Sequence, residues 1–188
     1  MTDDFSPAGE AIEGPPGDAI ERTPSSGVVR PDELDDDFYV ALQPLTLELI
    51  AHQLTRMNLE YSEQGRRLFA RFADFTLQIS VLNENDLSVR AMLKQQFPAP
   101  AMATVVGRCN WWNASELFVK ASATTIMVTP ESGGSPAPAV RVQLDLDLPC
   151  PMGVAPVQLQ ALLQGVLDNV TAFKSRSRIA DLSAFGWG

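Results

Sequence analysis

Histidine and cysteine are scarce in this chain of 188 residues, which contains one histidine and two cysteines. His52 has no acidic or metal-binding neighbour in the sequence, so we interpret it as a surface residue or a hydrogen-bonded residue at the core boundary. Cys109 and Cys150 are too few for a disulfide framework, and with one histidine they cannot complete a tetrahedral zinc site. The two thiols could lie close together in the fold, or both could be buried and reduced.

Sequence motifs for reaction chemistry are also missing. The chain has no glycine-rich phosphate loop and no pentapeptide of the nucleophile-elbow type. We therefore predict no catalytic residue, no bound metal and no cofactor, and we expect that the chain is not an enzyme.

Long apolar runs are absent as well. No stretch approaches the roughly 18 apolar residues that a membrane-spanning helix needs. The first residues lack the basic and apolar regions of a secretory signal peptide. Hydrophobic residues nevertheless make up 45% of the chain, which is enough for a core. These features predict one folded domain in the cytoplasm, without membrane contact.

The net charge of −9 is confined to the N-terminal segment. Residues 1–37 contain eleven acidic and two basic residues, so the rest of the chain is neutral. A neutral body exerts no general attraction on a phosphate backbone, which argues against binding to nucleic acid or to an anionic membrane. The segment is also rich in Pro, Gly and Ser and has no apolar periodicity, so it is predicted to be a disordered acidic tail.

The predicted domain covers residues 38–176, and a flexible C-terminal tail follows at 177–188. At the start of the domain, three aspartates at 35–37 precede Phe38 and Tyr39. This junction has two interpretations. It could be a solvated acidic run beside the first packed residues, or a short motif that docks into the groove of a partner protein.

The hydrophobic pattern predicts three helices and five strands. Apolar residues recur at the helical period in the helices and alternate with polar residues in the strands, most strictly between Val140 and Leu148. In chain order we expect a helix at 45–59, strands at 67–72, 75–81 and 87–93, a helix at 99–113, strands at 116–129 and 140–148, and a helix at 156–174. Strands with one apolar face indicate an antiparallel sheet that is covered on one side. The predicted class is α+β, with a five-stranded antiparallel sheet flanked by helices in the order α-β-β-β-α-β-β-α.

Two adjacent tryptophans stand at the predicted end of the second helix, within Asn110-Trp111-Trp112-Asn113. Neighbouring helical residues point about 100° apart, so at most one of them can face the core squarely. The other should lie at the margin, where its indole N–H needs a partner. Both side chains could complete the packing against the sheet, or one could serve as an aromatic anchor at a protein interface.

Asp145 and Asp147 are the one pair of carboxylates on a predicted regular element. Two residues apart on a strand, they point to the same face, about 7 Å from each other. A general acid pair or a metal site could use that spacing, and a solvated outer strand face would explain it equally well.

The stretch 45–176 resembles a YbjN-type domain, also described as a bacterial sensory transduction regulator domain. The resemblance is carried by a leading helix that runs into Leu59-Glu60-Tyr61, a strand that reaches Phe72 through Phe75, the segment 110–113 between the second helix and the fourth strand, and a closing helix that ends near Phe173. That family is similar in fold to type III secretion chaperones, which are commonly homodimers and bind extended segments of other proteins. The resemblance thus implies a non-enzymatic regulator or chaperone-like adaptor, and it carries over no catalytic residue.

Three functional hypotheses follow. The first is a homodimeric, chaperone-like module that binds a protein partner, with Trp111, Trp112 and Met92 at the interface and Phe38 and Tyr39 as further candidates. The second is a regulator that responds to a metal or small ligand through Asp145 and Asp147. The third is a scaffolding role in which the acidic tail docks elsewhere.

Overall fold

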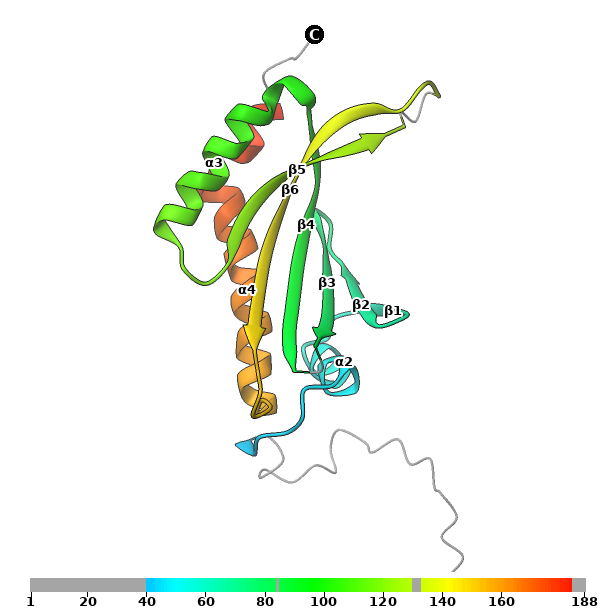
Figure 1. The fold of residues 1–188 in the computed structure, drawn as a ribbon, viewed down its shortest axis with the longest axis vertical. Coiled ribbons are helices and arrows are strands. Elements are labelled where there is room, and N and C mark those ends of the chain that lie inside the picture. The colour runs from blue at the N-terminus through cyan, green and yellow to red at the C-terminus, as the bar shows by residue number, and fades with distance from the viewer. Residues whose placement is uncertain (1–39, 84, 130–132, 184–188) are drawn as a thin grey trace, which may run out of the picture.

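The computed structural model describes residues 40–83, 85–129 and 133–183 and arranges them as one antiparallel sheet with its helices on one side (Figure 1). The elements are α2 (Leu47–Arg56), β1 (Tyr61–Gln64), β2 (Arg67–Arg71), β3 (Phe75–Leu82), β4 (Asp86–Pro98), the 3-10 helix η2 (Ala99–Ala101), α3 (Met102–Ser115), β5 (Lys120–Val128), β6 (Ala137–Pro149), α4 (Pro156–Arg176) and the 3-10 helix η3 (Ile179–Ser183). The predicted acidic tail, Phe38 and Tyr39 lie outside the described residues.

The sheet has six strands in the order β1-β2-β3-β4-β6-β5, so the predicted five-stranded sheet lacked one strand. The α+β class and the antiparallel pairing are confirmed, and the element order becomes α-β-β-β-β-α-β-β-α. The missing strand is β1, whose four residues are all exposed. Apolar and polar residues do not alternate along β1, so the hydrophobic pattern could not predict this strand. It pairs with β2 across a tight turn in which Gly65 adopts a φ of +60°.

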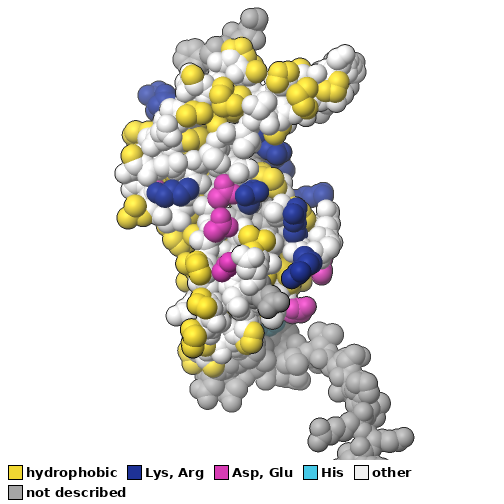
Figure 2. Space-filling model, in the orientation of Figure 1, with side chains coloured by type: hydrophobic (Ala, Val, Ile, Leu, Met, Phe, Trp, Pro, Cys, Tyr) yellow, Lys and Arg dark blue, Asp and Glu magenta, His cyan; other side chains and the backbone are white. Residues whose placement is uncertain are grey.

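One face of the sheet carries the core. Along β3, β4 and β6, alternate residues are buried while their neighbours stay partly exposed. The buried rows meet the apolar stripes of α2, α3 and α4, as the one-sided alternation predicts. The opposite face is polar, and Figure 2 shows basic and acidic side chains mixed over the strands. Among the described residues, no helix is long and apolar enough to cross a bilayer.

The helices begin and end where local chemistry allows. The hydroxyl of Thr46 accepts a hydrogen bond from the Leu49 N–H at 3.1 Å and so caps α2. Pro156 opens α4, where a missing N–H costs nothing. Residues 116–119, which we predicted to lie in a strand, form a loop instead, and β5 begins at Lys120.

The chain does not leave the core at the end of α4. The side chains of Ser177, Ile179 and Leu182 are buried, and the last two belong to η3. Ser177 Oγ donates a hydrogen bond to the Phe173 carbonyl, which ties this segment to α4. The predicted boundary at 177 stays a prediction, but Ser177, Ile179 and Leu182 pack into the domain.

Candidate functional site

An apolar pocket of about 640 Å³ lies where β6 ends and α4 begins. It is lined by Phe118, Leu148, Pro149, Cys150, Pro151, Met152, Gly153, Val154, Gln158, Ala161 and Leu162. Phe118 is 38% exposed and Met152 is 79% exposed, so two large apolar side chains stand at a surface opening. A pocket of this size with an apolar lining is suited to one or two large apolar side chains or to a small apolar ligand.

The loop between β6 and α4 forms one wall of the pocket and is held in place by backbone hydrogen bonds. The Cys150 N–H donates to the Asn85 carbonyl at 2.8 Å, and the Gly153 N–H donates to the Cys150 carbonyl at 2.9 Å. Gly153 has a φ of +84°, and a Cβ atom there would lie 2.1 Å from the Gln43 carbonyl oxygen. Only glycine fits this position, because the incoming chain at Gln43 passes directly against it.

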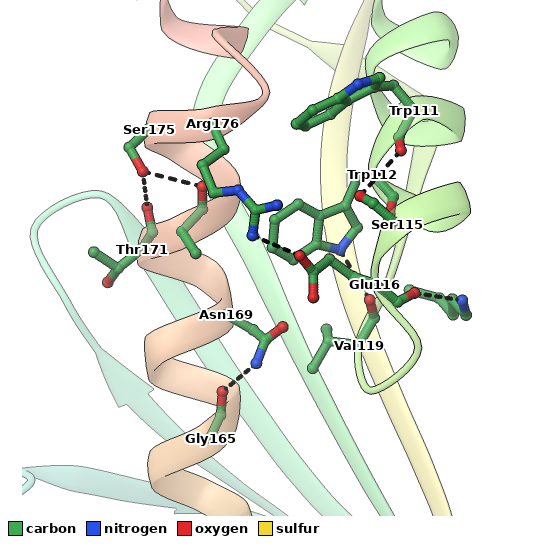
Figure 3. A network of polar contacts seen from close by, with 12 residues as sticks. Trp111, Trp112, Ser115, Glu116, Val119, Gly165, Asn169, Thr171, Ser175 and Arg176 are labelled. Atoms are coloured by element: carbon green, nitrogen blue, oxygen red, sulfur yellow. Dashed lines mark hydrogen bonds and ion pairs between the residues drawn. The ribbon is translucent and has the colours of Figure 1, made fainter.

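The opposite wall is the loop that carries Phe118, and two side chains of α3 fix that loop. Trp112 Nε1–H donates to the Val119 carbonyl at 2.9 Å (Figure 3). The amide of Asn113 bonds both backbone groups of Ala121: Nδ2–H donates to its carbonyl at 2.8 Å, and Oδ1 accepts from its N–H at 2.7 Å. Asn113 therefore pairs with the start of β5 as a neighbouring strand would.

α4 contributes a third anchor to the same loop. Arg176 Nη1–H donates to Glu116 Oε1 at 2.5 Å, and the guanidinium stands 5.6 Å from the centroid of the Trp112 ring (Figure 3). That ring also meets Phe173 edge-on at a centroid distance of 5.4 Å. A cation–π contact and an edge-to-face pair both favour this geometry. The loop at 116–119 is thus held from α3 and from α4.

Phe118 reaches α4 because residue 165 has no side chain. A Cβ atom at Gly165 would lie 3.1 Å from Phe118 Cε1, closer than ordinary packing allows. The ring therefore lies against the helix backbone and forms part of the pocket lining. The position of the pocket wall follows from a glycine in the middle of a helix.

Comparisons with known proteins agree with this fold. The model of the YbjN family, described as "Putative bacterial sensory transduction regulator", matches residues 46–177, which is more than half of the chain. The chain belongs to the YbjN family. The resemblance noted in the sequence is therefore confirmed, and the family is described as a regulator and not as an enzyme.

A solved YbjN structure shares the architecture. The chain is similar to the crystal structure of YbjN from E. coli, described as "a putative transcription regulator", with a TM-score of 0.56 and 15% sequence identity. The match covers 75% of this chain and 97% of that chain. At this identity the likeness establishes the fold alone. A search of the curated proteins finds no match.

In this YbjN-family domain the two adjacent tryptophans have different surroundings. Trp112 is fully buried and Trp111 is 47% exposed, which confirms that at most one of them faces the core. Trp112 takes part in the core and the loop network, and it presents no surface to a partner in this structure. The partner-binding role of Trp111 stays a prediction.

The remaining predicted partner residues are not gathered at the pocket. Met92 lies on the open face of the sheet, between Thr76 of β3 and Gln143 of β6. It is partly buried and does not line the pocket at the β6–α4 loop. Trp111 does not line that pocket either, and Phe38 and Tyr39 lie outside the described residues.

The two aspartates of β6 share the open face of the sheet but differ in their partners. Asp145 Oδ1 accepts from Arg90 Nε–H at 2.5 Å, and its Oδ2 accepts from Gln143 Nε2–H at 3.1 Å. Asp147 is exposed. Because the Asp145 oxygens are already occupied, the geometry does not favour a metal site on this pair. No group of three or more His, Cys, Asp or Glu side chains within 40–83, 85–129 and 133–183 could hold a metal.

The two cysteines and the histidine lack the pKa shifts that would make a reactive thiolate or a charged imidazole at neutral pH. Both thiols are free and buried. Burial raises the pKa of Cys109 to about 11, and burial also raises the pKa of Cys150, so both stay protonated at neutral pH. Burial, with a smaller contribution from the charge of Arg56, lowers the pKa of His52.

Phe118 and Met152 were missed as site residues by the sequence interpretation. Phe118 lies within the strand that the pattern predicts at 116–129, and Met152 stands between a proline and a glycine in the turn before the last helix. A large apolar residue inside a Pro/Gly-bracketed turn is a usable signal, because such a turn has little core against which to bury it.

Proposed function

We propose that this YbjN-family chain is a non-enzymatic regulator that acts as a chaperone-like adaptor, and that it binds a partner protein through the pocket at the β6–α4 loop. The observation that carries the proposal is the open apolar pocket with Phe118 and Met152 exposed at its mouth. Apolar surface at a concave site offers binding energy to an apolar side chain of a partner. Both walls are fixed by hydrogen bonds, so little ordering cost remains on binding.

The kind of partner follows from the lining. Among the described residues that line the pocket, Gln158 is the one polar side chain and none is charged. An extended partner segment with one or two large apolar residues suits such a site better than a charged ligand does. Trp111 and Met92 remain proposed secondary contacts on other surfaces of the same domain.

Matched substitutions test the pocket. We expect Phe118→Ser to abolish specific capture of the partner by the full chain in its native cell, with capture measured by crosslinking and quantitative mass spectrometry. Tyr61→Ser is the control, because Tyr61 has nearly the same exposure, 39%, and lies on β1, far from β6 in strand order. Equal capture by both variants would refute a role for the pocket.

We further propose that the chain acts as a homodimer through the β5–β6 hairpin. β5 forms an edge of the sheet, and the hairpin extends beyond the helices (Figure 1). Met127, on β5, is 64% exposed. An edge strand with exposed apolar residues favours pairing with another copy.

Sedimentation velocity of the full chain tests the dimer. We expect a dimer that Met127→Lys converts to monomer, because the substitution places a charge on the edge strand. A wild-type monomer at micromolar concentration would contradict the dimer and would leave the pocket proposal standing.

A further inference from the structure

The described chain begins at the rim of the apolar pocket. The Gln43 N–H donates to the Val154 carbonyl at 3.1 Å, and the Val154 N–H donates to the Gln43 carbonyl at 2.8 Å, so the two residues form an antiparallel bridge. Val154 and its neighbour Gly153 both line the pocket. The N-terminal segment therefore arrives beside the site and not at a distant surface.

The residues just before this bridge are apolar. Val40 is 67% exposed and Leu42 is 59% exposed, and Phe38 and Tyr39 precede them in the sequence. Figure 2 shows hydrophobic side chains gathered at the same end of the molecule, where β6 meets α4. Leaving both the apolar run and the apolar pocket lining exposed to water costs free energy, which contact between the two would recover.

The chain between Phe38 and the bridge at Gln43 is long enough for Phe38 to reach the pocket. Phe38 is five positions before Gln43, and an extended chain advances about 3.3 Å per residue, so Phe38 can reach roughly 16 Å from the bridge. Met152 is two residues from Val154, well within that reach. A segment tethered this closely is present at a high effective concentration at the pocket.

Charge complementarity supports the same placement. α4 begins at Pro156, next to the bridge, and has no acidic residue in its first turn. Ala155, at its N-cap, offers no side-chain oxygen, although Gln158 Oε1 accepts from the Ala155 N–H at 3.3 Å. The N-terminus of a helix carries partial positive charge and favours carboxylates. The three aspartates at 35–37 lie immediately upstream of Phe38 and can supply them.

We propose that Phe38 and Tyr39 of the same chain occupy the apolar pocket, with the aspartates at 35–37 beside the N-terminus of α4. The segment then competes with the partner for the site, so that partner binding requires its release. This inference rests on the proposed function for its biological meaning, but the docking itself can be measured without any partner.

Photocrosslinking in the full chain tests the docking. Benzoylphenylalanine is introduced in place of Phe38, the sample is irradiated, and crosslinked peptides are identified by mass spectrometry. We expect intrachain crosslinks to the pocket lining, above all to Met152 and Leu162. The control carries the same crosslinker in place of Phe5, which we expect to give no pocket crosslink. Crosslinks that map elsewhere, that join two copies, or that match the Phe5 control would overturn the proposal.

A second measurement uses 1-anilinonaphthalene-8-sulfonate as a probe of the free pocket. We expect the full chain with Phe38→Ser and Tyr39→Ser to bind the dye about tenfold more tightly if the segment occupies the pocket nine-tenths of the time. Adding Met152→Glu to that double variant should remove the gain. Unchanged dye affinity in the double variant would contradict occupancy by the segment.

The two proposals fail separately. If the crosslinks and the dye support docking while Phe118→Ser leaves partner capture unchanged, the self-docking stands and the proposed function falls. If Phe118→Ser abolishes capture while the Phe38 crosslinks miss the pocket, the proposed function stands and the self-docking falls.

Discussion

At the scale of single residues, the side-chain amide of Asn113 fixes the start of β5. It satisfies the N–H and the carbonyl of Ala121 at the point where β5 begins. We expect Asn113→Ala to lower the free energy of unfolding by about 2 kcal/mol, because two partly buried backbone groups lose their partner. Asn110→Ala, at an exposed position of the same helix, should change it by less than about 0.5 kcal/mol. Urea denaturation of both variants measures the difference, and similar losses would contradict this role.

Cys109 provides a pH-dependent test of core burial. Burial raises its pKa from 9.0 to about 11, so above pH 9 the unfolded chain releases the thiol proton while the folded chain keeps it. The stabilisation by Cys109 is therefore complete below pH 9 and is lost as the pH rises toward 11. We expect the difference in unfolding free energy between wild type and Cys109→Ala to shrink over that range.

The control for this pH dependence is Val105→Ala, a substitution of another buried residue of α3 that does not ionise. Its difference from wild type should stay constant with pH, as measured by urea denaturation at pH 7, 9 and 10. A constant difference for Cys109→Ala as well would show that the thiol is not protonated more strongly in the folded state.

The sequence could predict that one of the two adjacent tryptophans is buried, but not which one. Helical geometry predicts that one indole faces away from the core, and it does. Which indole is buried depends on the Val119 carbonyl and on Phe173, which lies 61 positions further along the chain than Trp112. No local pattern contains that information, so the sequence alone could not show that Trp112, a predicted interface residue, is the buried one.

At the scale of the elements, the contact between α4 and the loop at 116–119 gives a quantitative prediction. Gly107→Ala in α3 meets no atom within 4 Å and should stabilise the domain by about 1 kcal/mol, the usual gain in helix propensity. Gly165→Ala brings the same gain but displaces Phe118 from α4, so we expect a net change near zero.

A double-mutant cycle isolates the contact. In a Phe118→Ala background, Gly165→Ala should recover the full gain of about 1 kcal/mol, because the ring is no longer in the way. Thermal and urea unfolding of the four proteins give the coupling energy. Additive effects would show that Phe118 does not rest on the helix.

Most elements could be predicted because their apolar residues repeat at one clear period. The closing helix was predicted at 156–174 and occupies Pro156–Arg176, and the strand predicted at 75–81 occupies Phe75–Leu82. β1 was missed because all four of its residues are exposed, and the start of β5 was placed too early because residues 116–119 form a loop that Trp112 and Arg176 hold. In neither place does a local pattern of apolar residues mark where the strand begins.

At the scale of the whole molecule, the pocket is assembled from three distant segments. The loop at 116–119, the β6–α4 loop and the first half of α4 supply its lining, and the incoming chain at Gln43 holds its rim. A concave site made by packing loops together has no signature in any single stretch of the sequence. Its location required the fold.

The distribution of charge gives the last prediction. Residues 1–37 hold the whole net charge of −9, whereas the buried core begins at Leu45. Deleting 1–37 should therefore shift the melting temperature by no more than about 2 °C, since every described core side chain, from Leu45 onward, is kept. The shortened chain has almost no net charge near pH 7, so it should self-associate at lower concentration than the full chain. Light scattering at low salt measures this. The matched control keeps the full length and converts the eleven acidic residues to their amides. If charge is the cause, that control associates as the shortened chain does; if it stays soluble, the length of the segment and not its charge keeps the domain apart from its copies.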